Sequence, residues 1–439
     1  MANTIHKRAA DLILASMWQT PGKGYPSMFM VRRPGQSYVL GGLSTTVYFS
    51  RRELVRACLY IRKNGPPFLA YISLSEIWAL VTNFVTSNYW MISGETFLAR
   101  YRGSYADHLS AEGRYRIADA ISTSPIFAPV NELTLFPLVP VQVEAAFSSS
   151  EFFLRPPAEL ADEFDPRIRR HVLGDQFPPF DEMKIKREPT AAWLGVRAPN
   201  LHVARKMRSV VLGALALTPN YGQRHMFSGR HMFGGTCTVK GGVSVSFGRE
   251  HTPALMHDIR VTERDHPWLT RVSEMLSTTD RSVRRQRHAL EYFYRSWPLT
   301  DSERFPVLCM ALDAAFGDAN QATQAVIDGV RNTIGSHVDD DRLRLLMKLR
   351  ASVVHGGAPD VYDSSKYGQY YDRYDADPIR DLELVVVLCL KTLIFGDALI
   401  EHEDPNAALI AEMKAKRRIP DEPDELDILS AGAARAAPG

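Results

Sequence analysis

Apolar positions recur at helical spacing through most of the second half of the chain. At about 100° per residue, residues 341–354 place one apolar stripe along a helix. Residues 281–297 divide into an apolar face and a cationic face, whereas residues 382–395 (LELVVVLCLKTLIF) are apolar on nearly all sides. The first stripe consists of Leu343, Leu346, Leu349 and Val353. These patterns predict a bundle of helices, with the last of them buried.

The first part of the chain mixes helical and strand patterns. The alternating runs TCTV and VSVSF, separated by Lys240, Gly241 and Gly242, predict a β-hairpin. Residues 51–65 (RRELVRACLYIRKNG) predict a helix with a basic side. We therefore predict an α+β protein, in which a mixed α/β N-terminal region precedes an all-α helical bundle. The expected divisions are an α+β region (1–154), its β-rich second part (155–275), the helical domain (276–404) and a partly disordered tail (405–439).

Composition describes an ordinary soluble protein. The 52 Lys and Arg residues nearly balance the 50 Asp and Glu residues, so any nucleic-acid binding must come from local patches. The cysteines are far apart and form no CxxC pair, which argues against a zinc site or a disulfide framework and fits a reducing cytoplasm. The N-terminus has the pattern of an amphipathic helix and not of a signal peptide, and residues 382–395 are too few to span a bilayer. We therefore expect a cytoplasmic protein without membrane contact.

Candidate chemistry is concentrated in residues 349–357 (LRASVVHGG), where Arg350 and His355 flank four small or apolar residues. A guanidinium is always charged, so on an apolar stripe Arg350 must pair with an anion or face a cleft or interface. An imidazole suits proton transfer near neutral pH. On a regular helix the two side chains point about 140° apart. They can converge if the helix is distorted near Gly356, or if a second copy of the chain supplies one of them, which favours a homodimer.

Two further groups of residues are candidates for RNA binding. One is the cationic face of residues 281–297, made of Arg281, Arg284, Arg285 and His288, which can follow phosphates or be merely solvated. The other is a tyrosine-rich segment after Gly357, in which Tyr362 and Tyr367 can stack on unpaired bases or belong to an ordered flap. No metal site and no cofactor are expected, because the repeated RHMF segments at 224–227 and 230–233 have no carboxylate or cysteine at ligand spacing.

Three stretches together resemble the Apea-like branch of the HEPN superfamily: residues 281–297, residues 301–316 with RFPVLCMALDAAFG, and residues 345–357, followed by a long apolar helix. The mark of that family is an arginine followed after four to six residues by a histidine, which Arg350 and His355 match. The resemblance implies a metal-independent endoribonuclease of a bacterial defence or toxin system. Arg350 would hold phosphoryl oxygens and His355 would exchange protons, while the N-terminal region would sense a trigger or select RNA.

One residue departs from the pattern of this family and leaves an alternative function open. Ala351 follows the motif arginine, where many catalytic members of the family carry a polar residue. The alternative is a non-catalytic HEPN-like protein in which Arg350 and His355 shape a dimer face and the N-terminal region binds a partner or ligand.

Overall fold

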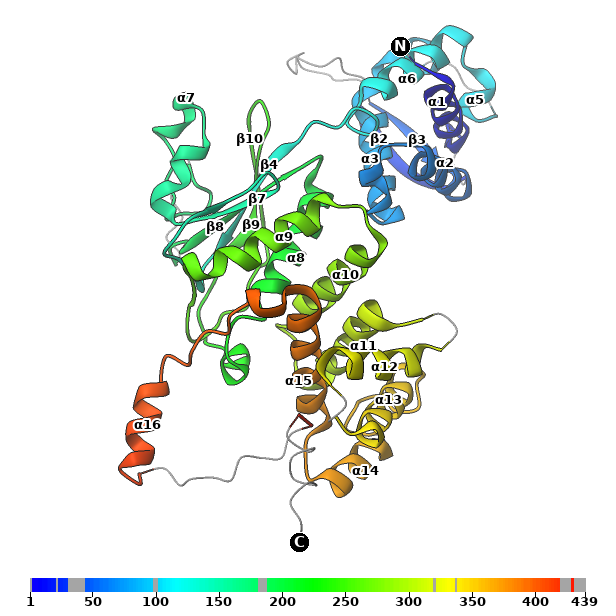
Figure 1. Ribbon diagram of the computed structural model, residues 1–439. Coiled ribbons are helices and arrows are strands. Elements are labelled where there is room, and N and C mark those ends of the chain that lie inside the picture. The colour runs from blue at the N-terminus through cyan, green and yellow to red at the C-terminus, as the bar shows by residue number, and fades with distance from the viewer. Residues whose placement is uncertain are drawn as a thin grey trace. The chain divides into compact units, whose positions relative to one another are not determined.

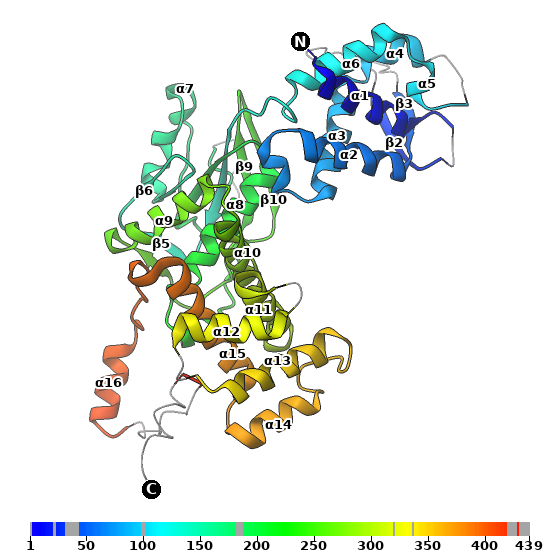
Figure 2. The same ribbon diagram turned by 45° about the vertical axis from the view of Figure 1, so that its right-hand side comes forward.

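The computed structural model describes residues 2–20, 23–30, 44–97, 102–180, 188–318, 321–335, 338–418 and 428–429 (Figures 1 and 2). The α+β fold class is confirmed, with sheets in the N-terminal region and helices in the C-terminal region. The chain divides into a smaller unit of residues 1–132 with 198–204, and a larger unit of residues 133–197 with 205–439. Part of the predicted N-terminal strand pattern, residues 31–43, lies outside the described residues.

The smaller unit packs helices around a three-stranded antiparallel sheet. Its strands are β1 (Met17–Trp18), β2 (Tyr25–Met30) and β3 (Ser44–Phe49), in the order β1-β3-β2. Its helices are α1 (Thr4–Ser16), α2 (Arg51–Asn64), α3 (Leu74–Asn88), α4 (Trp90–Thr96), α5 (Tyr105–His108) and α6 (Ala111–Thr123). The predicted N-terminal helix is α1. Its N-cap is Asn3, whose side chain accepts a hydrogen bond from His6 N. Ile13 of this helix is fully buried and forms part of the core.

The larger unit contains a six-stranded sheet with the order β10-β9-β4-β8-β7-β6. The strands are β4 (Glu132–Leu138), β6 (Phe147–Ser148), β7 (Phe152–Arg155), β8 (Ala192–Ala198), β9 (Gly234–Val239) and β10 (Val243–Gly248). The predicted hairpin is confirmed, because β9 and β10 pair in antiparallel register. A separate parallel pair joins β5 (Val141–Val143) to β11 (Ile259–Val261). The buried core of the sheet includes Leu135, Phe153 and Trp193.

Two further helices contact the first helix of the bundle. They are α8 (Leu201–Leu215) and α9 (His266–Ser277), of which α9 was not predicted from the sequence. Helix α8 approaches α10 (Arg281–Ser296) closely at Gly213, where an added Cβ would lie 2.3 Å from the carbonyl oxygen of Leu290. Glycine is therefore required at this crossing.

The bundle continues with α11 (Asp301–Phe316), α12 (Ala322–Ile334), α13 (Asp340–Val354), α14 (Ser365–Tyr374) and α15 (Pro378–Leu390), which lie side by side in both views (Figures 1 and 2). Local signals set the helix ends as predicted. Thr300 and Glu303 form the capping box of α11. Asp377 caps α15 and Pro378 takes its first position. The last predicted helix is buried, with Val385, Val386 and Leu390 fully inaccessible.

The divisions in the structure lie at different positions from those expected at 154 and 276. β4 begins at residue 132 and pairs with β9, about a hundred residues later, so the sheet draws its strands from both sides of residue 154. The sheet and the bundle also belong to one unit. Of the predicted tail, residues 407–415 form α16 (Ala407–Ala415), and residues 419–427 and 430–439 lie outside the described part.

Candidate active site

Helix α13 carries both residues of the predicted motif. Its N-cap is Asp339, whose Oδ1 accepts hydrogen bonds from the backbone N–H groups of Asp341 (2.9 Å) and Arg342 (3.4 Å). The helix stays regular through Val354 and ends at His355, followed by Gly356 with a φ of 76°. Glycine adopts this left-handed conformation without strain, which explains why the helix stops here.

Arg350 forms an ion pair with Asp313 of α11 through its Nη2 and the Oδ2 of the carboxylate. The two side chains are 21% and 28% exposed, so the pair is reachable from solvent. Burial raises the pKa of Asp313, and the charge of Arg350 only partly opposes this shift. The arginine expected on an apolar stripe therefore has an anionic partner within its own bundle.

Arg285, a predicted RNA-binding residue on α10, contacts the same end of α11. Its Nε donates to the carbonyl of Ala314 at 3.1 Å, and its Nη2 donates to the carbonyl of Gly317 at 2.6 Å. A cation at these carbonyls stabilises the C-terminal end of a helix. Arginines from α10 and α13 thus converge on the last turn of α11, residues 313–317.

His355 lies on the surface, just beyond Arg350. Its side chain is exposed, and within the described residues no hydrogen bond or ion pair joins it to Arg350. The turn after it is fixed by Ser352, whose carbonyl accepts from Gly357 N at 2.7 Å and whose hydroxyl bonds Ser364 at 3.0 Å. One copy of the chain therefore holds the two motif residues near each other in sequence but not in contact.

The rest of the predicted cationic face surrounds His288. Burial is the largest cause that lowers the pKa of His288, and the charges of Lys206, Arg287 and Arg284 lower it further. Arg281 is exposed at the first position of α10. Lys206 comes from α8 and was not part of the prediction. The helical periodicity of α10 could not reveal Lys206, because this residue reaches the cationic face only through the packing of α8 against α10.

The tyrosine-rich segment is partly the helix α14. Tyr362 is 50% exposed, and its ring meets that of Tyr367 edge to face, with 5.0 Å between the ring centroids. Tyr370, in contrast, is fully buried and hydrogen-bonds both Arg342 and Asp381. The segment therefore presents two open tyrosine rings, those of Tyr362 and of Tyr371, which is 52% exposed, and its buried part packs against α13 and α15.

Sequence reasoning missed two buried charge clusters. Arg342 is 2% exposed and pairs with Asp381, which is 1% exposed. The spacing of Arg342 from Leu346 and Leu349 is that of one helical face, so this burial could have been predicted.

The other cluster centres on Glu383, whose Oε1 lies 2.8 Å from His225 Nε2 and whose Oε2 lies 3.4 Å from Arg304 Nη1. Glu383 interrupts the apolar run of the last helix, which was the available signal.

No group of three or more His, Cys, Asp or Glu side chains among the described residues is placed to hold a metal ion. In the described part of the chain, no helix is long and apolar enough to cross a membrane. Comparison with models of protein families, with curated proteins and with solved structures gives no match to this chain.

Proposed function

We propose that the bundle of α10 to α15 is a metal-independent endoribonuclease of a bacterial defence or toxin system. The supporting observation is that Arg350 and Arg285, from two different helices, converge on the last turn of α11, with His355 exposed beyond them. Two guanidinium groups on one turn are suited to hold a phosphodiester, and an exposed imidazole is suited to exchange protons with the ribose.

Each residue has a role that fits its surroundings. His355 takes the proton of the 2′-hydroxyl, the 2′-oxygen attacks phosphorus, and the protonated His355 then gives a proton to the 5′-oxygen as its bond to phosphorus breaks. Arg350 stabilises the added negative charge of the pentacoordinate phosphorane. Asp313 orients Arg350 before RNA arrives, and the phosphate then shares the guanidinium. Lys206, Arg281 and Arg284 attract the RNA backbone, and Tyr362 stacks on an unpaired base.

A homodimer completes the site in this proposal. Arg350 and His355 do not meet within one copy, and a two-fold axis beside α13 brings Arg350 of one protomer towards His355 of its partner. The N-terminal region senses the trigger or selects RNA. All four cysteines are free thiols and buried, which supports a reducing cytoplasm as the location.

A second function is favoured by the ion pair itself. Asp313 neutralises Arg350, and Ala351 follows it, which supports a non-catalytic protein in which the bundle mediates dimerisation and the N-terminal region binds a partner or ligand. The two functions differ in whether RNA is cut.

The deciding experiment incubates the purified protein with a labelled RNA in excess chelator. We expect cleavage products that end in a 2′,3′-cyclic phosphate or a 3′-phosphate, and no cleavage of DNA or of RNA blocked at the 2′-hydroxyl. Arg350→Ala and His355→Ala should each lower the rate by about 10²- to 10⁴-fold. Arg344→Ala on the same helix and His231→Ala on the sheet region are matched controls and should cut normally. Cleavage that needs added magnesium, or that survives both motif substitutions, contradicts the proposal.

A further inference from the structure

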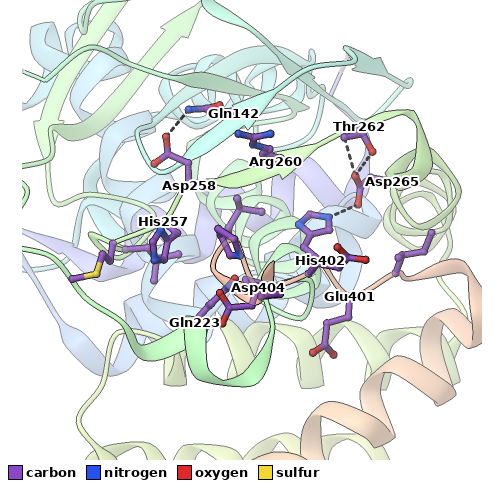
Figure 3. A pocket seen from close by; sticks show the side chains of 18 of the residues that line it. Gln142, Gln223, His257, Asp258, Arg260, Thr262, Asp265, Glu401, His402 and Asp404 are labelled. Carbon is purple, nitrogen blue, oxygen red and sulfur yellow. Dashed lines mark hydrogen bonds and ion pairs between the residues drawn. The ribbon is translucent and has the colours of Figure 1, made fainter. Parts of the chain in front are cut away.

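A pocket of about 920 Å³ lies within the larger unit, beside the parallel pair β5–β11 (Figure 3). One wall comes from residues 255–265 and another from residues 400–408, which follow the last bundle helix. Pockets of this volume hold whole organic ligands, whereas a single ion or amino acid would leave most of it unfilled. None of its lining residues belongs to the proposed active site.

A buried carboxylate fixes one histidine on the wall. Asp265 Oδ1 lies 3.1 Å from His402 Nε2, and the same carboxylate accepts from Trp268 Nε1 at 2.9 Å and from Thr262 N at 2.8 Å. Burial acts to raise the pKa of Asp265, but these hydrogen bonds outweigh it and lower that pKa, so the group is charged. His402 therefore donates from Nε2 to this carboxylate, and in its neutral form it leaves Nδ1 as an acceptor. Figure 3 shows the His402 ring between Asp265 and the middle of the pocket.

Two donors complement this acceptor. Asn406 Nδ2 lies 3.4 Å from His257 Nε2, and because an amide nitrogen only donates, His257 carries its proton on Nδ1. Gln223 lines the same pocket and is 9% exposed, yet its Nε2 has no hydrogen-bond partner in the described part of the chain. A buried donor left unpaired is unfavourable, so this position is suited to an acceptor on a bound molecule.

Charges of both signs line the same space. Arg230 is already neutralised by Glu188 and Asp258. The ion pair of Arg260 with Glu144 is long, at 3.7 Å, and the arginine side chain is 70% exposed. Arg264 is exposed and has no ion pair among the described residues. Both arginines are thus available for an anionic group. The carboxylates of Glu403 and Asp404 lie on the wall formed by residues 400–408.

We infer that this pocket binds a nucleoside phosphate. The apolar side chains of Leu255, Ile259 and Ile400 provide a surface for the flat face of a base. The donors of Gln223 and His257 and the acceptor of His402 match the mixed hydrogen-bonding edge of a base. Ribose hydroxyls donate to the carboxylates of Glu403 and Asp404. Arg260 and Arg264 hold the phosphate.

Binding of the four ribonucleoside 5′-monophosphates, measured by calorimetry and by thermal shift on the full chain, tests this inference. We expect at least one of them to bind and to raise the melting temperature. Adenosine and inorganic phosphate, each measured separately, should bind at least about tenfold more weakly. The double variant Arg260→Ala, Arg264→Ala should weaken binding by about tenfold or more, because a charge-assisted phosphate contact is lost at each position. Gln223→Ala should weaken it by a smaller factor and mainly for the preferred base.

Arg52→Ala is the matched control, because this side chain is 83% exposed and lies outside the pocket. It should bind like the parent, as should His231→Ala, an exposed residue outside both the pocket and the proposed active site. The inference is overturned if none of the four monophosphates binds, if inorganic phosphate alone binds as tightly, or if the double arginine variant, folded by circular dichroism, binds as well as the parent.

Discussion

Arg350 of α13 and Asp313 of α11, 37 residues apart in sequence, form an ion pair at the end of α11. The pair holds the motif arginine in place and sets the charge it presents. Oδ1 of Asp313 is buried and has no hydrogen-bond partner among the described residues, so this carboxylate is only half satisfied. Its ionisation therefore has consequences for stability that can be measured.

The ion pair predicts a specific dependence of stability on pH. Because burial raises the pKa of Asp313 above its ordinary value of 3.8, the folded state binds the proton more tightly than the unfolded chain does. Its contribution to the free energy of unfolding therefore falls as the pH rises from 3.8 through the raised value. Asp313→Asn should remove this part of the decline in urea titrations at several pH values. Asp328→Asn, an exposed site on α12, should keep the profile of the parent; an unchanged profile in Asp313→Asn contradicts the prediction.

The cluster of Arg342, Asp381 and Tyr370 predicts a large loss of stability on substitution. Both charged side chains are almost inaccessible, at 2% and 1% exposure, so Asp381→Ala leaves a buried guanidinium without its anion. We expect the free energy of unfolding to drop by about 3–5 kcal/mol. Tyr370→Phe, which removes only the hydroxyl, should cost about 1–3 kcal/mol. Asp372→Ala on the exposed side of α14 should be near neutral in the same denaturation experiment. Equal effects of Asp372→Ala and Asp381→Ala would rule out a special role of the buried pair.

Glu383 predicts the opposite response to acid. Burial acts to raise the pKa of Glu383, but the hydrogen bond from His225 and the charges of His225, Arg304 and Arg224 lower it below the ordinary 4.5. The resulting stabilisation is complete above pH 4.5 and is lost as the pH falls through the lowered value. Glu383→Gln should be less stable at neutral pH and lose less stability on acidification. Glu412→Gln, whose side chain is 56% exposed, is the control. If Glu383→Gln loses as much stability as the parent when the pH falls, Glu383 does not titrate as described.

The cationic face predicts how RNA binding depends on salt. In the His355→Ala background, Arg281→Ala and Lys206→Ala should each weaken binding of a single-stranded RNA. Each should also reduce the slope of log K against log salt by about 0.7. Arg52→Ala should leave affinity and slope unchanged. Fluorescence anisotropy over a series of salt concentrations provides the measurement, and unchanged slopes in both variants would remove this face from the RNA path.

A composite site predicts complementation between inactive variants. If each site takes Arg350 from one protomer and His355 from its partner, a heterodimer of Arg350→Ala with His355→Ala contains one intact site and one doubly defective site. Mixing the two variants in equal amounts should therefore restore about a quarter of the parent activity, since about half of the dimers are mixed. Light scattering should report a dimer. If the mixture stays as inactive as its components, the two residues act within one chain or not at all.

The sequence by itself determined features that depend on neighbouring residues. The capping box of Thr300 with Glu303, the start of α15 at Asp377 and Pro378, and the β9–β10 hairpin were all predicted and are confirmed. Each involves hydrogen bonds or turn geometry within a few positions of the chain, so the amino acids specify it locally. The RNA roles of Arg281, Arg284 and Tyr362 stay predictions.

Only the tertiary structure decided which charges meet. Glu383 and His225 are 158 residues apart in sequence, and Asp265 and His402 are 137 residues apart. Arg350 of α13 pairs with Asp313 of another helix, α11. The periodicity of an apolar stripe shows that a charged residue will be buried, but it does not name the partner. The partner depends on which helix packs against that face, and this packing is set by the burial of apolar surface across the whole fold.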